Sequence, residues 1–451
     1  MAGARAADEN IICRTSQMPM MTFQELFSQN RPLRVPTLQR RYCWTDAQFE
    51  RLLGDVVRIA IETGGDRDIL IGYAVSGKRH SLGRVLVSET VTKDGSFLLL
   101  DGQQRITTAS ILFSAIRDTI LRKIEAERFS CDAEEVASAT SLCEEIGHYI
   151  FLPIDAPSIS PRNQASIAIL CPTFFDRVAY LHVSGAARYA GNERVEIASI
   201  VSNACPEATQ ALSSLMTYSG GGERITRAKQ YFDGALPEAI ARILAPQHPA
   251  TGSSSRLDSN AASLSDTVNA CGKLTRALAY GFSLLWFLDG GADAFTVYER
   301  LAFRDAALAA MANARPGVSL AEADLVRNYL LSFFSTESAQ LQVYAEYWAP
   351  IELRYSAADQ EGHATGLDDF FKRFLQAEGP VVKKPNIGAM GGAAHLSGPF
   401  FPTYRAIRAY VEGRLSHADV PLADACSSKG EAVVRAVMER MMVCYVHFYK
   451  Q

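Results

Sequence analysis

A short polar segment is the part of the sequence best suited to chemistry. It reads Asp101-Gly102-Gln103-Gln104-Arg105 and is followed closely by Thr107 and Thr108. A β-type run, Ser96–Leu100, precedes it and an amphipathic pattern follows, which predicts a tight turn between a strand and a helix N-terminus. Backbone N–H groups at a helix N-terminus lack intrahelical partners, and the helix dipole favours an anion there. The position therefore predicts an anion-binding turn.

The side chains of this turn are of the types that a nucleotide phosphate site needs. Gly102 lets the backbone approach a ligand closely, and Arg105 supplies a planar guanidinium that suits phosphate oxygens. Asp101 can hold Mg²⁺ or orient an attacking water. We therefore expect Asp101, Gln103 and Arg105 to be catalytic, with Asp101 as the metal ligand. The simpler alternative is a surface turn in which Arg105 only pairs with Asp101.

Uncharged groups complete this predicted site. The nucleotide-binding residues expected beside the catalytic ones are Gly102, Gln104, Thr107 and Thr108. Their amide, hydroxyl and backbone groups offer hydrogen-bond donors and acceptors without adding charge.

A second polar segment, Val35–Trp44, contains Gln39, and three arginines lie in it or directly before it: Arg34, Arg40 and Arg41. This basic cluster could meet phosphates, or it could be a solvated face. Tyr42 and Trp44 could stack on a base or cover a nucleotide, although packing against the strand turn is the stronger expectation for Trp44.

A third group of polar residues comes from the C-terminal half of the chain. Its members are Glu299, Asp324 and Asn328. They could add a second polar group to the cleft, whereas Asp324 could equally only cap or neutralise a helix.

The pattern of apolar and turn residues predicts an α+β protein, with a small mixed α/β part followed by a large, mostly helical region. The expected divisions are a flexible tail at 1–20, a first domain at 21–130, a helical extension at 131–246, a linker at 247–266 and a C-terminal helical domain at 267–451.

Several local elements follow from periodicity and capping signals. Thr22, with Glu25 three residues later, is typical of a capping box, and Thr45 is expected to cap the next helix. A long helix is expected from Ile106 to Ile124. Further strands are expected at Ile69–Val75 and Arg84–Val91, and further helices at Leu274–Leu288, Thr296–Met311, Leu320–Phe334 and Ala432–Tyr449.

Composition narrows the class of protein. The 451 residues carry a net charge of −4, which argues against a basic surface over the whole chain. The nine cysteines are scattered and odd in number, as is typical of reduced intracellular thiols. No stretch resembles a membrane span or a signal peptide, so we expect an intracellular protein, cytoplasmic or nuclear, with no membrane contact.

The order of the polar segments resembles one family. Pro-x-x-Gln-Arg-x-Tyr-x-Trp at 36–44, an Ile-Gly pair at 71–72 and Asp-Gly-Gln-Gln-Arg-x-Thr-Thr at 101–108 are similar to the N-terminal domain of GmrSD-type restriction endonucleases. The similarity continues through Ile225–Phe232, Val297–Leu301, Gly317–Leu320 and Ala323–Leu330, and so extends from about residue 22 to 348.

The resemblance implies a ParB/sulfiredoxin-like fold for the first domain, with binding and hydrolysis of a nucleoside triphosphate coupled to DNA restriction. In ParB relatives the corresponding turn holds a triphosphate. The family's Gln-Arg pair carries over onto Gln39 and Arg40, which would face the same cleft. The expected cofactors are thus Mg²⁺ and a nucleoside triphosphate, and the expected partners are DNA and a separate nuclease or effector subunit.

The sequence departs from the family pattern at several points. Leu38 stands where an aromatic residue is usual, and Ala302 where the family has Asn. None of the eight histidines lies in the His-x-x-Pro or paired-ligand setting that an HNH nuclease needs. Cleavage of DNA by this chain alone is therefore not expected. Two other functions stay open, namely a non-catalytic module that binds DNA or a partner through the same cleft, and a nuclease with an unrecognised active site.

Overall fold

The computed structural model describes residues 20–37, 39–75, 80–88, 96–152, 168–186, 222–245, 262–289, 295–296, 298–299, 301–303, 306, 322–352, 367–378 and 401–449. The chain divides into two compact units. The first comprises Met1–Val35, Arg41–Ala204 and Gly222–Gly291, and the second comprises Pro36–Arg40, Cys205–Gly221 and Ala292–Gln451. Within the described residues, no helix is both long and apolar enough to cross a membrane.

The first unit contains a mixed sheet with the strand order β1-β6-β3-β4-β2-β5. The strands are β1 (Met20–Met21), β2 (Leu33–Arg34), β3 (His80–Ser88), β4 (Phe97–Asp101), β5 (Leu170–Cys171) and β6 (Phe282–Asp289). β4 is antiparallel to β3 and parallel to β2, which in turn pairs in parallel with β5. The strand that ends at Asp101 therefore lies inside the sheet.

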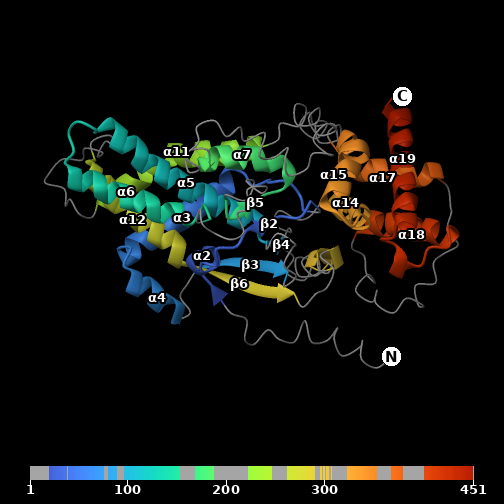
Figure 1. Ribbon diagram of the computed structural model, residues 1–451, viewed down its shortest axis with the longest axis horizontal. Helices are drawn as coiled ribbons and strands as arrows, with labels where there is room; N and C mark the ends of the chain where they lie inside the picture. Colours follow the sequence, from blue (N-terminus) through green and yellow to red (C-terminus); the bar gives the residue numbers. More distant parts are fainter. Residues whose placement is uncertain are drawn as a thin grey trace. The chain divides into compact units, whose positions relative to one another are not determined.

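The described part of the first unit also contains eight helices, which are labelled in Figure 1. They are α2 (Phe23–Phe27), α3 (Asp46–Thr63), α4 (Arg67–Val75), α5 (Gln103–Ala126), α6 (Ala133–Gly147), α7 (Phe174–Ser184), α11 (Glu223–Leu244) and α12 (Leu264–Tyr280). Helix α5 packs against α6, α7, α11 and α12, and every residue from Ile106 to Arg117 is buried. A helix buried on all sides belongs to the core, so the site at its N-terminus has a rigid base.

The described part of the second unit is mostly helical and contains no strand. Its elements are α14 (Glu322–Ser332), α15 (Glu337–Val343), the π-helix η5 (Tyr344–Trp348), α17 (Leu367–Glu378), α18 (Pro402–His417), the 3₁₀ turn η7 (Leu422–Asp424) and α19 (Ser428–Tyr449). Aromatic side chains fill its core, where Trp348 stacks on Phe371 and Phe374 meets Tyr410 edge to face. A mixed sheet with helices and a helical C-terminal region together confirm the predicted α+β class.

The capping predictions are confirmed. The hydroxyl of Thr22 accepts from the backbone N–H of Glu25 (3.1 Å), whose carboxylate accepts in return from the backbone N–H of Thr22 (2.7 Å). Thr45 precedes α3, and its N–H donates to the side chain of Gln48 (2.9 Å). The predicted long helix is present as α5. The strands predicted at Arg84–Val91 and Ser96–Leu100 correspond to β3 and β4, and the helices predicted at Leu320–Phe334 and Ala432–Tyr449 correspond to α14 and α19.

The strand predicted at Ile69–Val75 is wrong, because these residues belong to helix α4. The β-branched residues favoured a strand, but the carboxylate of Asp66 accepts from the backbone N–H groups of Asp68 (2.8 Å) and Ile69 (3.2 Å). This local cap starts a helix. Within it Leu70 is buried while Ile69 is largely exposed.

The single helix predicted at Leu274–Leu288 is also wrong in its second half. Helix α12 ends at Tyr280, and Phe282–Asp289 form β6, which pairs in parallel with β3 along its length. Gly281 marks the change, since a Cβ there would lie 2.4 Å from the carbonyl oxygen of Ala277. A short apolar run does not distinguish a helix from a buried strand.

Two other predicted segments are only partly covered. Of the linker expected at 247–266, residues 247–261 lie outside the described residues and α12 begins at Leu264. Of the helix expected at Thr296–Met311, residues 296, 298–299, 301–303 and 306 are described, and these are helical.

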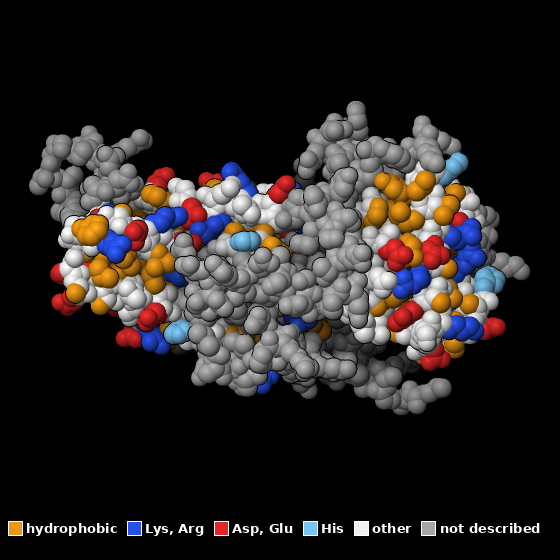
Figure 2. Space-filling view, turned by 45° about the horizontal axis from the view of Figure 1, so that its top comes forward, with side chains coloured by type: hydrophobic (Ala, Val, Ile, Leu, Met, Phe, Trp, Pro, Cys, Tyr) orange, Lys and Arg blue, Asp and Glu red, His pale blue; other side chains and the backbone are white. Residues whose placement is uncertain are grey.

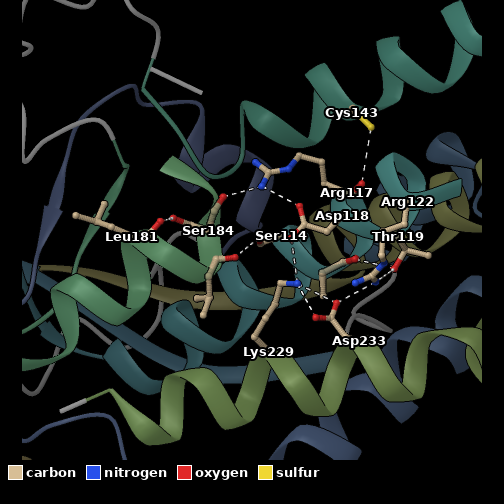
Figure 3. A network of polar contacts seen from close by, with 12 residues as sticks. Ser114, Arg117, Asp118, Thr119, Arg122, Cys143, Leu181, Ser184, Lys229 and Asp233 are labelled. Atoms are coloured by element: carbon tan, nitrogen blue, oxygen red, sulfur yellow. Dashed lines mark hydrogen bonds and ion pairs between the residues drawn. The ribbon is translucent and has the colours of Figure 1, made fainter. Parts of the chain in front are cut away.

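A buried polar network joins α5 to α7 and α11 (Figure 3). One guanidinium nitrogen of Arg117 donates to the carbonyl of Ser184 (2.7 Å) and to Asp118 (3.1 Å). The ammonium of Lys229 bridges Asp118 (3.0 Å) and Asp233 (2.7 Å). Because the charges are paired inside the helix packing, the network fixes the orientation of α5, whose first turn carries the polar motif.

We predict that Arg117→Ala lowers the free energy of unfolding by about 3 kcal/mol, because it leaves the buried carbonyl of Ser184 without its charged donor and removes one of the two cations beside Asp118. Arg122→Ala is the control, since Arg122 is 56% exposed and pairs with Asp233 at 3.1 Å; its cost is about 0.5 kcal/mol or less. Urea unfolding measures both. An equal loss of unfolding free energy in the two variants would contradict the assignment of the network to the core.

Candidate functional site

The polar motif forms the predicted turn between β4 and α5. Asp101 is the last residue of β4, Gly102 is the N-cap of α5, and the first intrahelical bond runs from the N–H of Ile106 to the carbonyl of Gly102 (3.0 Å). Gly102 has φ +93°, a left-handed conformation that disfavours any residue with a Cβ. The glycine is therefore required by the backbone of the turn itself.

Asp101 and Arg105 are the charged, partly exposed side chains of the turn. Oδ1 of Asp101 accepts from the backbone N–H of Gly102 (2.6 Å) and lies 3.8 Å from Nη1 of Arg105. Their side chains are 26% and 30% exposed, respectively. An ion pair at this distance and exposure contributes little stability, so the turn presents one negative and one positive group whose mutual attraction does not by itself hold the turn in shape.

Gln104 binds the backbone of the polar segment Val35–Trp44. Its Nε2 donates to the carbonyl of Arg41 (3.1 Å) and its Oε1 accepts from the N–H of Cys43 (2.9 Å). Gln104 is buried, and these two bonds fix the amide. One N–H and one lone pair of the amide remain for further contacts.

Thr108 and Tyr42 make a second connection between the two motifs. Their hydroxyl oxygens lie 2.6 Å apart. The hydroxyl of Thr108 also donates a hydrogen bond to the carbonyl of Gln104 (2.7 Å). Tyr42 is buried and its ring stacks on Phe49 with 6.4 Å between ring centroids. Burial raises the pKa of Tyr42 far above its ordinary value. Tyr42 thus has the environment of a packed core residue, whereas Trp44 is half-buried.

Asp176 belongs to this arrangement and is absent from the sequence predictions. Its Oδ2 accepts from the backbone N–H of Tyr42 (2.7 Å) and from the hydroxyl of Thr173 (2.9 Å). Burial raises the pKa of Asp176, while these two bonds and the charge of Arg41 act in the opposite direction. The Thr-x-x-Asp spacing at the start of α7 is a capping signal that could have drawn attention to the residue.

The other residues predicted for the site are either buried at the start of α5 or belong to the second unit. Gln103 and Thr107 are buried in the first turns of α5. Gln39, also buried, and the half-buried Arg40 belong to the second unit, where the charge of Arg40 acts on Tyr298. Their approach to the turn stays a prediction.

The third predicted group lies among ion pairs of the second unit. Glu299 accepts from the hydroxyl of Tyr404 and from Arg408 (2.5 Å). Asp324 pairs with Arg327 at 3.0 Å.

Asn328 is fully buried in the same helix, α14, as Asp324. Its Oδ1 accepts from Nε of Arg327 (3.3 Å). The structure thus joins Asp324 and Asn328 through one arginine and gives Glu299 a different partner, and a role of these residues in a cleft stays a prediction.

The side chains at the turn fit Mg²⁺ only if a bound molecule supplies further oxygen atoms to the metal. Among the described residues, no three His, Cys, Asp or Glu side chains are grouped so that they could hold a metal ion. Mg²⁺ commonly uses one or two carboxylates together with phosphate oxygens and waters. A single carboxylate at Asp101 is therefore compatible with a metal that arrives with a nucleotide.

The comparison with known families concerns this same part of the chain. Residues 23–174 match the family model described as GmrSD restriction endonuclease, N-terminal domain. The match contains the segments around Tyr42 and Asp101, and this part of the chain belongs to that domain family. No curated protein matches the chain. The match confirms the resemblance inferred from the motifs within residues 23–174, and its description relates this part of the chain to DNA restriction. The similarity predicted for the later segments, from Ile225 to Leu330, lies outside the match and stays a prediction.

The bond between Tyr42 and Thr108 is testable by a double-mutant cycle. Tyr42→Phe and Thr108→Val each remove one buried hydroxyl and leave the other without its partner, so each single change is destabilising. The double variant removes both hydroxyls, and we expect a coupling free energy of about 1 kcal/mol or more in urea unfolding. Additive effects would show that the two hydroxyls do not bind each other.

Proposed function

We propose that the chain binds a nucleoside triphosphate with Mg²⁺ at the Asp101–Arg105 turn and hydrolyses it. The observation that carries the proposal is the turn itself, in which a left-handed Gly102 starts a core helix between two partly exposed charged side chains. The N–H groups of such a helix start attract anions. Membership of residues 23–174 in a restriction endonuclease domain family supports a role related to DNA restriction.

The proposed roles follow from the charges. Asp101 would hold Mg²⁺, which lets a carboxylate and a phosphate occupy the same helix end without repulsion. Arg105 would neutralise phosphate charge that develops during transfer. Gln103, at the base of the turn, would orient the attacking water, and Gln104, Thr107 and Thr108 would keep the turn in shape while adding contacts to the nucleotide.

Two variants of the turn test this proposal. We expect Arg105→Ala to lower kcat/KM for triphosphate hydrolysis on the order of 100-fold, because it removes stabilisation of transition-state charge. Asp101→Asn is expected to lower the rate at saturating Mg²⁺ to the level that EDTA gives with the wild-type chain, because the variant lacks the carboxylate that would hold the metal. Phosphate release with each of the four ribonucleoside triphosphates measures the rate.

Another ion pair on a helix of the same unit provides the matched control. Arg58 and Asp55 on α3 are 2.6 Å apart, and Arg58 is 49% exposed. Arg58→Ala and Asp55→Asn should leave hydrolysis unchanged. Hydrolysis at the wild-type rate in both Arg105→Ala and Asp101→Asn, with the chain folded, would eliminate the proposed site.

We further propose DNA and a separate nuclease subunit as the partners. The family description supports DNA as the target of the system. On the face drawn in Figure 2, acidic and basic side chains of the described residues are interspersed, so this face shows no extended area of a single charge. Nonspecific binding of DNA depends on clustered basic side chains, and the net charge of −4 argues against such a surface over the whole chain; in this proposal the nuclease subunit contributes to DNA binding.

The purified chain with Mg²⁺ and a triphosphate is therefore expected to leave supercoiled plasmid intact. Agarose electrophoresis over several hours, with a known nuclease as a positive control, detects nicking. Metal-dependent nicking that co-purifies with the chain and is lost in an Asp101→Asn variant would assign cleavage to the chain itself.

A further inference from the structure

The segment Arg41–Trp44 has no helix or strand of its own, yet its backbone is held at three consecutive residues. Gln104 binds the carbonyl of Arg41 and the N–H of Cys43, and Asp176 accepts from the N–H of Tyr42. Side chains here replace the hydrogen bonds that a regular element would provide.

The two side chains come from different helices. Gln104 lies in the first turn of α5, next to the polar turn, whereas Asp176 lies in the first turn of α7. Asp176 is 4% exposed and is held in place by the hydroxyl of Thr173 (2.9 Å). If Asp176 had no carboxylate, the segment Arg41–Trp44 would keep its hydrogen bonds to Gln104 of α5 but would lose its backbone hydrogen bond to α7.

We infer that Asp176 is a positioning residue that fixes the segment Arg41–Trp44, and with it the position of Arg41 and Trp44, relative to the Asp101 turn. Asp176 lies beyond the matched residues 23–174, so the family comparison does not assign it a role. The consequence for ligand binding rests on the proposed function: a segment that is free to move would align its basic and aromatic side chains poorly with a bound triphosphate. The consequence for the order of the segment does not depend on any ligand.

Two substitutions separate the hydrogen bonds of Asp176 from its charge. Asp176→Asn can place its Oδ1 where Oδ2 stands and still accept from Tyr42 and Thr173, but it carries no charge. Asp176→Ala removes both bonds. If the bonds position the segment, the asparagine variant resembles the wild type and the alanine variant does not.

The chain offers a matched control at the start of α12. Asp266 accepts from the hydroxyl of Ser263 (2.8 Å) in the same local capping arrangement that Asp176 makes with Thr173. Its hydrogen bonds are to Ser263 alone among those described, without a bond to a distant segment. Asp266→Ala therefore removes a comparable cap and leaves the segment Arg41–Trp44 untouched.

Cys43 reports on the segment directly, since it is a half-buried cysteine within it that forms no disulfide. We expect iodoacetamide to alkylate Cys43 about tenfold faster in Asp176→Ala than in the wild type, as loss of one buried hydrogen bond costs roughly a factor of ten. Asp176→Asn and Asp266→Ala should react at the wild-type rate. Peptide mapping separates Cys43 from the other cysteines.

Triphosphate affinity is the second readout, measured by titration calorimetry of the full chain with Mg²⁺ and a non-hydrolysable analogue. Asp176→Ala should bind about tenfold more weakly, and Asp176→Asn at least as tightly as the wild type. Unchanged Cys43 reactivity in a folded Asp176→Ala variant overturns the inference, as does an asparagine variant as reactive as the alanine one. If the wild type binds no triphosphate, the proposed function fails, and the Cys43 rates still decide the role of Asp176.

A measurement on the wild type covers the case in which Asp176→Ala does not fold. The Tyr42 amide should exchange with solvent about 100-fold or more slowly than an amide in an irregular chain, because its hydrogen bond must open first. Exchange at the rate of an unstructured chain overturns the inference.

Discussion

The hydrogen bonds from Gln104 to the backbone of Arg41 and Cys43 are the constraint on which the rest of the site depends. They join two polar segments that are about sixty residues apart in sequence. Because Gln104 lies in the first turn of a helix that is buried on every side, the attached segment inherits the rigidity of the core. Irregular backbone can then carry functional groups without a strand or helix of its own.

This constraint divides the motif Asp101–Arg105 into two parts with different tasks. Gly102 and Gln104 shape the turn and hold the neighbouring segment, whereas Asp101 and Arg105 remain partly exposed. The division explains why one short motif combines small, amide and charged residues. Each type meets a separate physical requirement, which is a left-handed backbone, a satisfied buried amide, or a charged group at the partly exposed surface of the turn.

Much of this could be predicted from the sequence because the signals are local. The turn after β4, the caps at Thr22 and Thr45, and the long helix α5 depend on residues close together in the chain. The family relation of residues 23–174 was also visible in the motifs. The strand predicted at Ile69–Val75 failed since one capping carboxylate outweighed β propensity.

The features that sequence reasoning missed depend on distant partners. Strand β6 is a strand because β3 offers it a parallel edge, which its own apolar residues do not reveal. Asp176 acts on Tyr42, a residue 134 positions away, and only the fold shows that its carboxylate reaches this N–H. The spacing of polar residues located the turn, whereas the contacts that hold it in position required the tertiary structure.

Hydrogen exchange with and without Mg²⁺ and each ribonucleoside triphosphate tests the central claim most directly, because it locates the ligand on the chain. The proposed site predicts that the amides of Gly102–Ile106 exchange more slowly once the nucleotide is bound, with little change in the far end of α5. Protection elsewhere in the chain, with the turn unchanged, would contradict it.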